Sequence, residues 1–295
     1  MITVSSLTKT YAGFTAVDDV SFTAQTGRVT GFLGPNGAGK STTMRIMVGL
    51  TPASTGTALI DGRRFVDLPN PGAEVGVLLD ASAQHAGRTG REILTIAQRT
   101  MGLPKSRVRE MLDLVSLTDT EAERRVRNYS LGMRQRLGLA TALLGDPHVL
   151  ILDEPANGLD PAGIRWMRDL LRGYADQGGT VLLSSHLLHE IEVIADDLVV
   201  IGNGRIVAQG TKADLLATAG TVARAADAVA LASAVERGGH TVTVHADNSI
   251  HTDATTDQVG QAALAAGVAL TELRGADGAG LEDMFLELTA DTQRE

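Results

Sequence analysis

Short apolar runs separated by turn-forming residues dominate the first 80 positions, a pattern typical of β-strands. The pair Asp61-Gly62 marks one of these turns. A Gly-rich turn after the third run leads into helical spacing from about residue 40 to residue 49. The pattern therefore predicts a strand-rich start with one early helix, and the expected strands are residues 2–4, 20–22, 29–33, 57–60 and 74–79.

From about residue 82 to residue 145 the chain is Arg-rich, and its apolar residues recur at helical spacing. Helices are expected at residues 91–101, 106–116 and 131–144. Strand-sized apolar runs return at residues 149–152, 180–184 and 198–201, with helical patterns at 162–175 and 187–195 between them. Strands that alternate with helices predict an α/β fold whose largely parallel sheet is covered on both faces.

After Gly210 the chain becomes Ala-rich and acidic, and residues 211–295 hold 5 basic and 13 acidic side chains. Helices are expected at residues 225–237, 256–266 and 281–289, with strands at 241–245 and 268–273. We therefore expect two domains, an α/β domain at residues 1–212 and a small α+β appendix at residues 218–295.

Composition narrows the class of protein. Hydrophobic residues make up 43% and charged residues 21%, which is ordinary for a globular chain. No apolar run approaches the roughly 18 residues that cross a bilayer, and the start MITVSSLTKTY does not have the pattern of a signal peptide. The lack of cysteine excludes disulfides and thiolate zinc sites. From these features we expect a cytoplasmic protein. Because no basic stripe is present, we expect no nucleic-acid partner.

The stretch from Gly34 to Ser41 has the P-loop pattern G-x-x-x-x-G-K-[ST] directly after an apolar strand and before a helix. Backbone N–H groups of such a loop converge on phosphates. Lys40 adds a point charge for the β- and γ-phosphates, and the Ser41 hydroxyl is a ligand for Mg²⁺. A Gly-rich turn that binds nothing is the alternative. The loop residues are Gly34, Pro35, Asn36, Gly37, Ala38, Gly39, Lys40, Ser41 and Thr42.

Two carboxylates follow the apolar run at residues 149–152, at the strand end where ligands of parallel sheets bind. Asp153 can hold Mg²⁺ through water, and Glu154 is placed to polarise an attacking water. The alternative is an acidic pair that caps a loop. His186, after the strand at residues 180–184, can donate to a γ-phosphate, although a single histidine there is more often structural.

The octapeptide YSLGMRQR, residues 129–136, begins a predicted helix. Ser130 is a good N-cap, and a helix N-terminus attracts phosphate. Gly132 permits close approach of backbone to a nucleotide. In isolation, the octapeptide is also compatible with an ordinary capped helix.

Together these motifs resemble those of the ATP-binding cassette (ABC) ATPases over about residues 1–210. The resemblance implies a P-loop NTPase core with a mixed or parallel sheet, an N-terminal antiparallel β subdomain, a helical subdomain at about residues 82–145, and ATP with Mg²⁺ as cofactors. By position, residues 34–42 match Walker A, residues 149–155 match Walker B with catalytic Glu154, and Gly158-Leu159-Asp160 matches the D-loop that faces a partner cassette. His186 matches the switch histidine, a catalytic position like that of Lys40, and Tyr11 matches the aromatic residue that stacks on adenine.

YSLGMRQR falls where this family carries its signature LSGGQ, so Ser130 and Gly132 are expected to cap ATP bound to a second protomer. Leu131 and Met133 depart from the family pattern. Asp80 stands where the family has the Q-loop glutamine, which makes it a candidate metal ligand. Gln84 lies four residues further on, and either residue is open for the Q-loop role.

Within the family, the GRTGREIL stretch, YSLGMRQR and the terminal LEDMFLELT resemble drug and antibiotic exporters whose ATPase subunit is a separate chain. This implies a dimer, expected to be a homodimer, and a separate membrane permease that docks beside the Asp80 loop. It also implies a place on the inner face of the membrane and a dimerisation or regulatory role for residues 218–295. The alternatives are an ABC-type ATPase acting on ribosomes or DNA, and a P-loop kinase or GTPase. A single Walker A and the missing Asn-Lys-x-Asp motif count against them.

Overall fold

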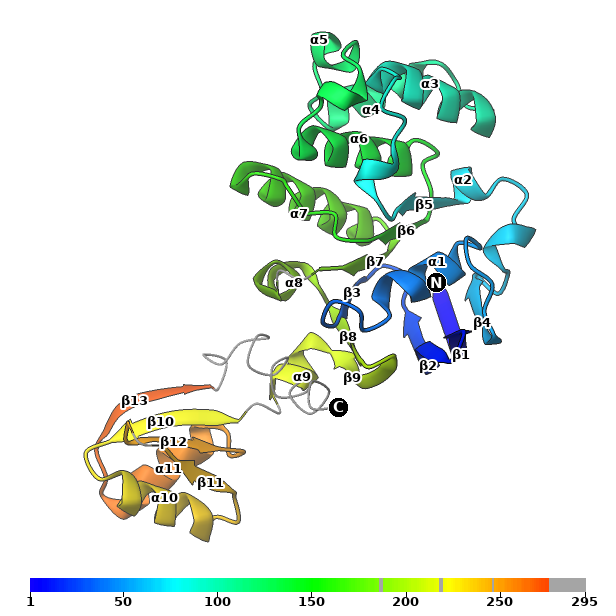
Figure 1. Cartoon of the computed structure of the whole chain (residues 1–295). Helices are drawn as coiled ribbons and strands as arrows, with labels where there is room; N and C mark the ends of the chain where they lie inside the picture. The colour runs from blue at the N-terminus through cyan, green and yellow to red at the C-terminus, as the bar shows by residue number, and fades with distance from the viewer. Residues whose placement is uncertain (186–187, 218–219, 246, 276–295) are drawn as a thin grey trace. The chain divides into compact units, whose positions relative to one another are not determined.

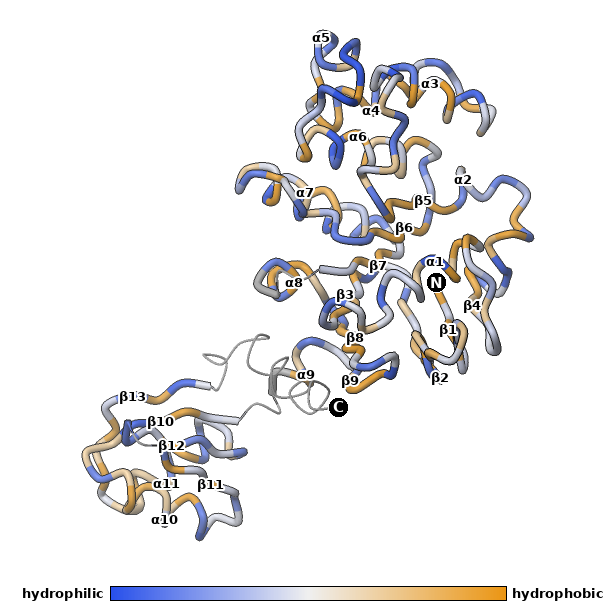
Figure 2. Tube along the Cα trace, in the orientation of Figure 1, coloured by the Kyte–Doolittle hydropathy of each residue, from blue (hydrophilic) through white to orange (hydrophobic). Residues whose placement is uncertain are grey.

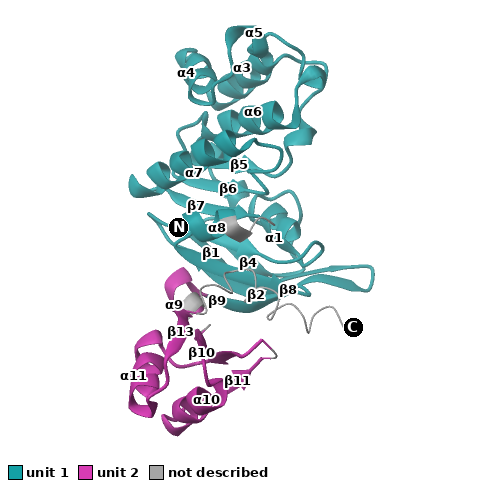
Figure 3. Ribbon diagram, turned by 90° about the vertical axis from the view of Figure 1, so that its left-hand side faces the viewer, with its two compact units in different colours: residues 1–209 teal, residues 210–295 magenta. Residues whose placement is uncertain are grey.

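Two units make up the chain, Met1–Gln209 and Gly210–Glu295 (Figure 3). The computed structural model describes residues 1–185, 188–217, 220–245 and 247–275 of them. Within these residues, every helix is too short or too polar to span a bilayer.

A six-stranded sheet forms the centre of the first unit, with the strand order β5-β6-β7-β3-β8-β9 (Figure 1). The pairs from β5 to β8 are parallel, as the alternation of strands and helices predicts. Strands β3, β6 and β7 are buried along their whole length, which explains why their sequences are mainly apolar. The strands are β3 Val29–Leu33, β5 Val75–Leu78, β6 Val149–Leu152, β7 Thr180–Ser184, β8 Asp197–Gly202 and β9 Arg205–Thr211.

A second, antiparallel sheet of the first unit has the order β2-β1-β4. One hydrophobic core joins it to helix α1 and to the six-stranded sheet, through residues such as Leu7, Met44 and Ile151. Figure 2 shows strands β6 to β8 as apolar segments, whereas the surroundings of α5 are hydrophilic. The bounds are β1 Ile2–Tyr11, β2 Phe14–Ala24, β4 Thr55–Ile60 and α1 Lys40–Met47.

Helices α6, α7 and α8 pack against the six-stranded sheet, where α6 contacts β5, α7 contacts β7 and β3, and α8 contacts β3. Gly31 in β3 allows α8 to approach, because a Cβ atom there would lie 2.6 Å from Cγ2 of Ile191. The helices are α2 Pro71–Glu74, α3 Gly90–Met101, α4 Ser106–Leu114, α5 Asp119–Ala122, α6 Leu131–Leu143, α7 Pro161–Asp176 and α8 Leu188–Ile194, with 3-10 turns η1 Phe65–Asp67, η2 Ala81–Ala83 and η3 Val126–Asn128.

In its described residues, the second unit begins with helix α9, and a four-stranded antiparallel sheet with helices α10 and α11 follows in the order β10-α10-β11-β12-α11-β13. The strand order β11-β12-β10-β13 is that of the ferredoxin-like split βαβ arrangement. Its own core joins both helices to the sheet. The bounds are α9 Lys212–Ala217, β10 Thr221–Ala225, α10 Ala228–Arg237, β11 Val242–Val244, β12 Ser249–Thr252, α11 Thr256–Ala266 and β13 Leu270–Gly275.

The structure confirms the α/β fold class with a small α+β appendix and corrects some elements. The helix expected from residue 225 begins only at Ala228, because residues 221–225 form β10 and Asp227 caps the helix by accepting from Ala230 N. The structure also contains strands β9, β10 and β12, which the sequence analysis does not predict. The helix expected at residues 281–289 lies outside the described residues.

Candidate functional site

The predicted phosphate loop connects β3 to α1 at the carboxyl edge of the parallel strands. Two of its glycines are required by space. A Cβ atom on Gly34 would lie 2.4 Å from the carbonyl oxygen of Ile201, and one on Gly39 would lie 2.6 Å from that of Ala16. Gly39 also has φ +108°, a conformation that favours glycine. A residue with a side chain at Gly34 or Gly39 would therefore disrupt this loop.

Lys40 begins α1 and folds back over this loop. Its Nζ atom donates to the carbonyl oxygens of Gly34 at 2.6 Å and Pro35 at 3.2 Å. Burial lowers the pKa of the Lys40 ammonium below its usual range, and the carboxylates of Glu154 and Asp153 oppose this shift only in part. The ammonium is thus held next to a cavity of about 170 Å³, whose lining is Asn36, Gly37, Gly39, Lys40, Ser41, Thr42, Asp153 and Glu154.

Ser41 and Asp153, two of the three predicted metal ligands, come from separate motifs and meet in this cavity. The Ser41 hydroxyl donates to Oδ2 of Asp153 at 2.6 Å, and the buried Ser184 hydroxyl donates to Oδ1. A hydroxyl and a carboxylate in contact are the hard oxygen donors that Mg²⁺ prefers. The donor set therefore fits Mg²⁺.

Glu154 follows Asp153 with φ +51°, an uncommon backbone conformation for a residue other than glycine. Its N–H donates to Ser184 Oγ at 3.1 Å. Its carbonyl oxygen accepts from Asn157 N at 3.1 Å and from Nε2 of Gln135 at 3.2 Å. Its peptide is thus hydrogen bonded from both sides, with the side chain placed among Lys40, Ser41 and Asp153 in the cavity lining.

Ser184 and Gln135 are absent from the sequence-based site. Ser184 is the polar residue at the carboxyl end of β7, and the motif LLSSH directs attention past it to His186. Gln135 lies inside YSLGMRQR, five residues after the cap. The polar residue at the end of the strand that follows Walker B could have indicated Ser184. No signal in the sequence indicates Gln135, because only the fold brings it to Glu154.

The signature stretch begins α6 as the sequence predicts. Ser130 is the exposed N-cap and accepts from Met133 N at 3.2 Å. The preceding Tyr129 is buried, its hydroxyl donates to the carbonyl oxygen of Glu121 at 2.7 Å, and burial raises its pKa. This contact fixes the start of α6 against α5.

Gly132 meets the D-loop of its own chain. A Cβ atom on Gly132 would lie 2.8 Å from the carbonyl oxygen of Gly158, and one on Gly158 would lie 2.4 Å from Cγ of Leu131. The bulky Leu131 therefore fits here because Gly158 has no side chain. Asp160 ends the D-loop as the N-cap of α7, where its Oδ1 accepts from Gly163 N at 2.8 Å.

The two Q-loop candidates flank η2, with Asp80 as its N-cap and Gln84 as its C-cap. Oδ1 of Asp80 accepts from Ser82 N at 2.7 Å, and bonds from the Ser82 hydroxyl and amide lower the pKa of Asp80. Gln84 donates through Nε2 to the carbonyl oxygen of Arg134 in α6 at 2.9 Å. Neither residue is among the described residues that line the cavity. The Asp80 metal role stays a prediction.

Two further predicted residues lie apart from the cavity lining. Tyr11 is at the end of β1 beside Phe14, 46% exposed, and the Lys9 ammonium lies 4.8 Å from its ring centroid. An exposed ring can stack on a base. His186 lies outside the described residues.

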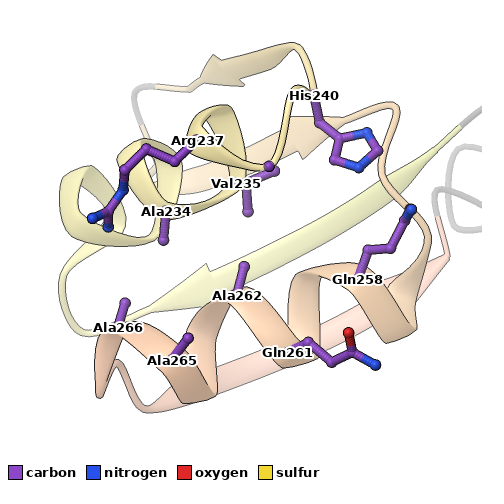
Figure 4. A pocket seen from close by; sticks show the side chains of 10 residues that line it. Ala234, Val235, Arg237, His240, Gln258, Gln261, Ala262, Ala265 and Ala266 are labelled. Carbon is purple, nitrogen blue, oxygen red and sulfur yellow. The ribbon is translucent and has the colours of Figure 1, made fainter.

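A groove of about 480 Å³ lies between α10 and α11 in the second unit (Figure 4). Small side chains such as Ala234, Ala262 and Ala265 line it, and His240 and Gln258 lie at one end. Its lining residues include neither a glycine-rich loop nor a carboxylate pair, unlike the cavity beside Lys40 in the first unit.

Comparison with known proteins agrees with this geometry. The family model described as ABC transporter matches residues 17–157. The uncharacterised ABC transporter ATP-binding protein YhcH of Bacillus subtilis (strain 168) is 43% identical over 210 residues, which cover 70% of this chain and 68% of that protein. The bacitracin transport ATP-binding protein BcrA of Bacillus licheniformis is 39% identical over 210 residues, with the same coverage of 70% and 68%.

Solved structures show the same fold. The ATP-binding subunit of an ABC transporter superposes with a TM-score of 0.67 at 29% identity, covering 73% of this chain and 91% of that one. The ATP-binding cassette MJ0796, a dimer bound to ADP and Pi, superposes with a TM-score of 0.65 at 21% identity, covering 72% of this chain and 98% of that one.

Proposed function

The chain belongs to the ATP-binding subunits of the ABC transporter family, and from this premise we propose that it drives a membrane exporter of antibiotics or other drugs. It is an ABC ATPase, which binds ATP in its cassette and hydrolyses it to drive transport. The convergence of Lys40, Ser41, Asp153 and Glu154 on one cavity carries the assignment of the reaction to this site. The export of antibiotics is supported by the likeness to a bacitracin transport protein.

In the proposed reaction, the P-loop amides and the Lys40 ammonium bind the β- and γ-phosphates of ATP. The Glu154 carboxylate accepts a proton from the water that attacks the γ-phosphorus atom, and ADP is the leaving group. Ser41 and Asp153 would hold Mg²⁺, which when bound neutralises charge on the phosphate oxygens. His186 contacts the γ-phosphate, and Tyr11 stacks on adenine.

A second protomer completes the site in this proposal. Ser130 and Gly132 at the N-terminus of α6 cap ATP that the partner binds, and Asp160 faces the partner. The exposure of Ser130 supports this arrangement, as does the dimeric state of the cassette MJ0796. A homodimer satisfies it, since both halves of the site occur in one chain.

A separate permease carries the transported compound in this proposal, and it docks on the inner face of the membrane beside the Asp80 loop. The ATPase core spans residues 1–212. Residues 218–295 form the accessory unit, with a role in dimerisation or regulation.

Substitution of Glu154→Gln tests the reaction. The amide cannot accept the proton, so we expect kcat to fall at least 100-fold, while ATP binding persists and the protein elutes as a dimer in ATP. Hydrolysis at the wild-type rate would exclude Glu154 as the base.

Export is tested separately in cells. Deletion of the gene for this protein should make the cells more sensitive to bacitracin. Expression of the wild-type protein should restore resistance, and expression of the Glu154→Gln variant should not. Unchanged sensitivity to bacitracin and to a panel of other antibiotics would refute export of this class and leave the ATPase assignment intact.

A further inference from the structure

Gln135 connects the signature helix α6 to the backbone of Glu154, the proposed catalytic base of the same chain. It is 4% exposed, and its Nε2 donates to the Glu154 carbonyl oxygen at 3.2 Å. It lies on the same helix as Ser130, five residues further along, or about 7.5 Å along the axis. Helix α6 therefore carries the signature residues at its N-terminus and contacts the backbone of Glu154 through Gln135.

The Gln135 contact is not needed to satisfy the hydrogen bonds of the fold. The Glu154 carbonyl oxygen already accepts from Asn157 N at 3.1 Å. Within the described residues, Oε1 of Gln135 has no hydrogen-bond partner, although buried polar atoms normally have one. A buried glutamine that leaves its own acceptor unpaired contributes little net stability. Its remaining effect is to fix where Glu154 lies relative to α6.

We propose that Gln135 is a positioning residue that transmits the engagement of Ser130 with the partner's ATP to Glu154 of its own site. This inference rests on the proposed function of the signature stretch. Because α6 moves as one body, a shift at its N-terminus displaces Gln135 and, through the hydrogen bond, the Glu154 peptide. Each base then adopts its working position only when the other protomer's ATP is engaged, which makes hydrolysis cooperative in ATP.

The substitution Gln135→Met keeps the length and volume of the side chain and removes the donor. We expect kcat to fall about tenfold and the Hill coefficient for ATP to fall to about 1, with KM and the affinity of the separate protomer for a fluorescent ATP analogue within twofold of wild type. A purely structural role would instead lower the melting temperature and leave kcat per folded molecule and the Hill coefficient unchanged, which would overturn the proposal.

Gln98→Met is the matched control. Gln98 is also buried in the helical part, 6% exposed, and its Nε2 also donates to a backbone carbonyl, that of Leu103. We expect this variant to keep the wild-type kcat and Hill coefficient. An equal loss of turnover in both variants would show that any buried glutamine of this part matters and would overturn the specific role of Gln135.

Amide hydrogen exchange decides the point without turnover. In nucleotide-free protein, residues 153–158 should exchange at least threefold faster in Gln135→Met than in wild type, and at the wild-type rate in Gln98→Met. Unchanged exchange in Gln135→Met overturns the proposal. If the wild-type protein hydrolyses no ATP, the proposed function fails, whereas this exchange measurement still decides whether Gln135 positions Glu154.

Discussion

The substitution Ser184→Ala removes a hydroxyl that joins both carboxylate residues of the site. Ser184 is 0% exposed, donates to Oδ1 of Asp153 and accepts from Glu154 N. A bond to a charged acceptor contributes about 1.5–3 kcal/mol, and a buried N–H left without a partner costs about 1–3 kcal/mol. Because the two bonds share one oxygen atom, they are not additive. We therefore expect a loss of about 3–4 kcal/mol in the free energy of unfolding of the first unit.

Trp166, the only tryptophan of the chain, provides the stability assay. It lies in α7 of the first unit, 4.9 Å from the Arg136 guanidinium of α6. Its fluorescence should report a melting temperature lowered by roughly 6–15 °C. At a temperature where both proteins are folded, kcat should fall at least tenfold, because displacement of the Glu154 carboxylate by about 1 Å is enough for such a loss.

Thr180→Val on the same strand is the control. Thr180 is 1% exposed, and its hydroxyl has no hydrogen-bond partner within the described residues. Valine should therefore leave kcat unchanged and keep or raise the melting temperature. The reasoning is refuted if Ser184→Ala melts within 2 °C of wild type and keeps its kcat. A lowered melting temperature with unchanged kcat would show that Ser184 supports the sheet without positioning the base.

Other perturbations test single contacts. Asp80→Asn keeps the acceptor for Ser82 N and removes the charge, so the predicted metal role of Asp80 would raise the Mg²⁺ concentration needed for half-maximal hydrolysis about tenfold or more; a change within twofold would refute that role. Bound phosphate should raise the lowered pKa of Lys40, so at pH values above that lowered pKa ATP binding takes up a proton and the affinity falls by up to about tenfold per pH unit. Calorimetry at such a pH, in buffers of different ionisation enthalpy, measures this uptake, and its absence there contradicts the reasoning. Gly132→Ala places a Cβ atom 2.8 Å from the Gly158 carbonyl oxygen, so turnover should fall at least tenfold while ATP binding by the separate protomer is kept; wild-type turnover would show that the D-loop yields without consequence.

The central strands were predictable because they are buried on both faces and therefore read as continuous apolar runs. The expected bounds at residues 29–33, 149–152 and 180–184 match β3, β6 and β7. Strand β1 extends well beyond the expected residues 2–4. The prediction was too short because shifts of register after Val4 and Leu7 interrupt the alternation of apolar and polar positions. Edge and irregular strands therefore need the pairing partner to be recognised.

The missed strands have separate physical reasons. Strand β9 follows Asn203-Gly204, both with positive φ. Such a pair after an apolar strand is a strong indication of a hairpin, which a prediction from hydrophobic periodicity does not use. Strand β10 contains three residues of low or neutral strand preference among five, Ala223, Arg224 and Ala225, so its sequence resembles the helix that follows. Pairing with β12 and β13, and not local preference, makes it a strand.

The same distinction between local and long-range information applies to the residues of the site. Walker A and the carboxylate pair are contiguous motifs, so their cavity could be predicted from spacing alone. The bonds that hold Glu154 come from β7 and α6, and no local pattern links Ser184 or Gln135 to it. Gly132 illustrates the difference, because its sequence context suggested room for a nucleotide, whereas the structure shows that it already makes room for the Gly158 carbonyl of its own D-loop. If the signature stretch also caps a partner's ATP, one small residue has to satisfy both contacts, and the D-loop and the signature helix must then move together.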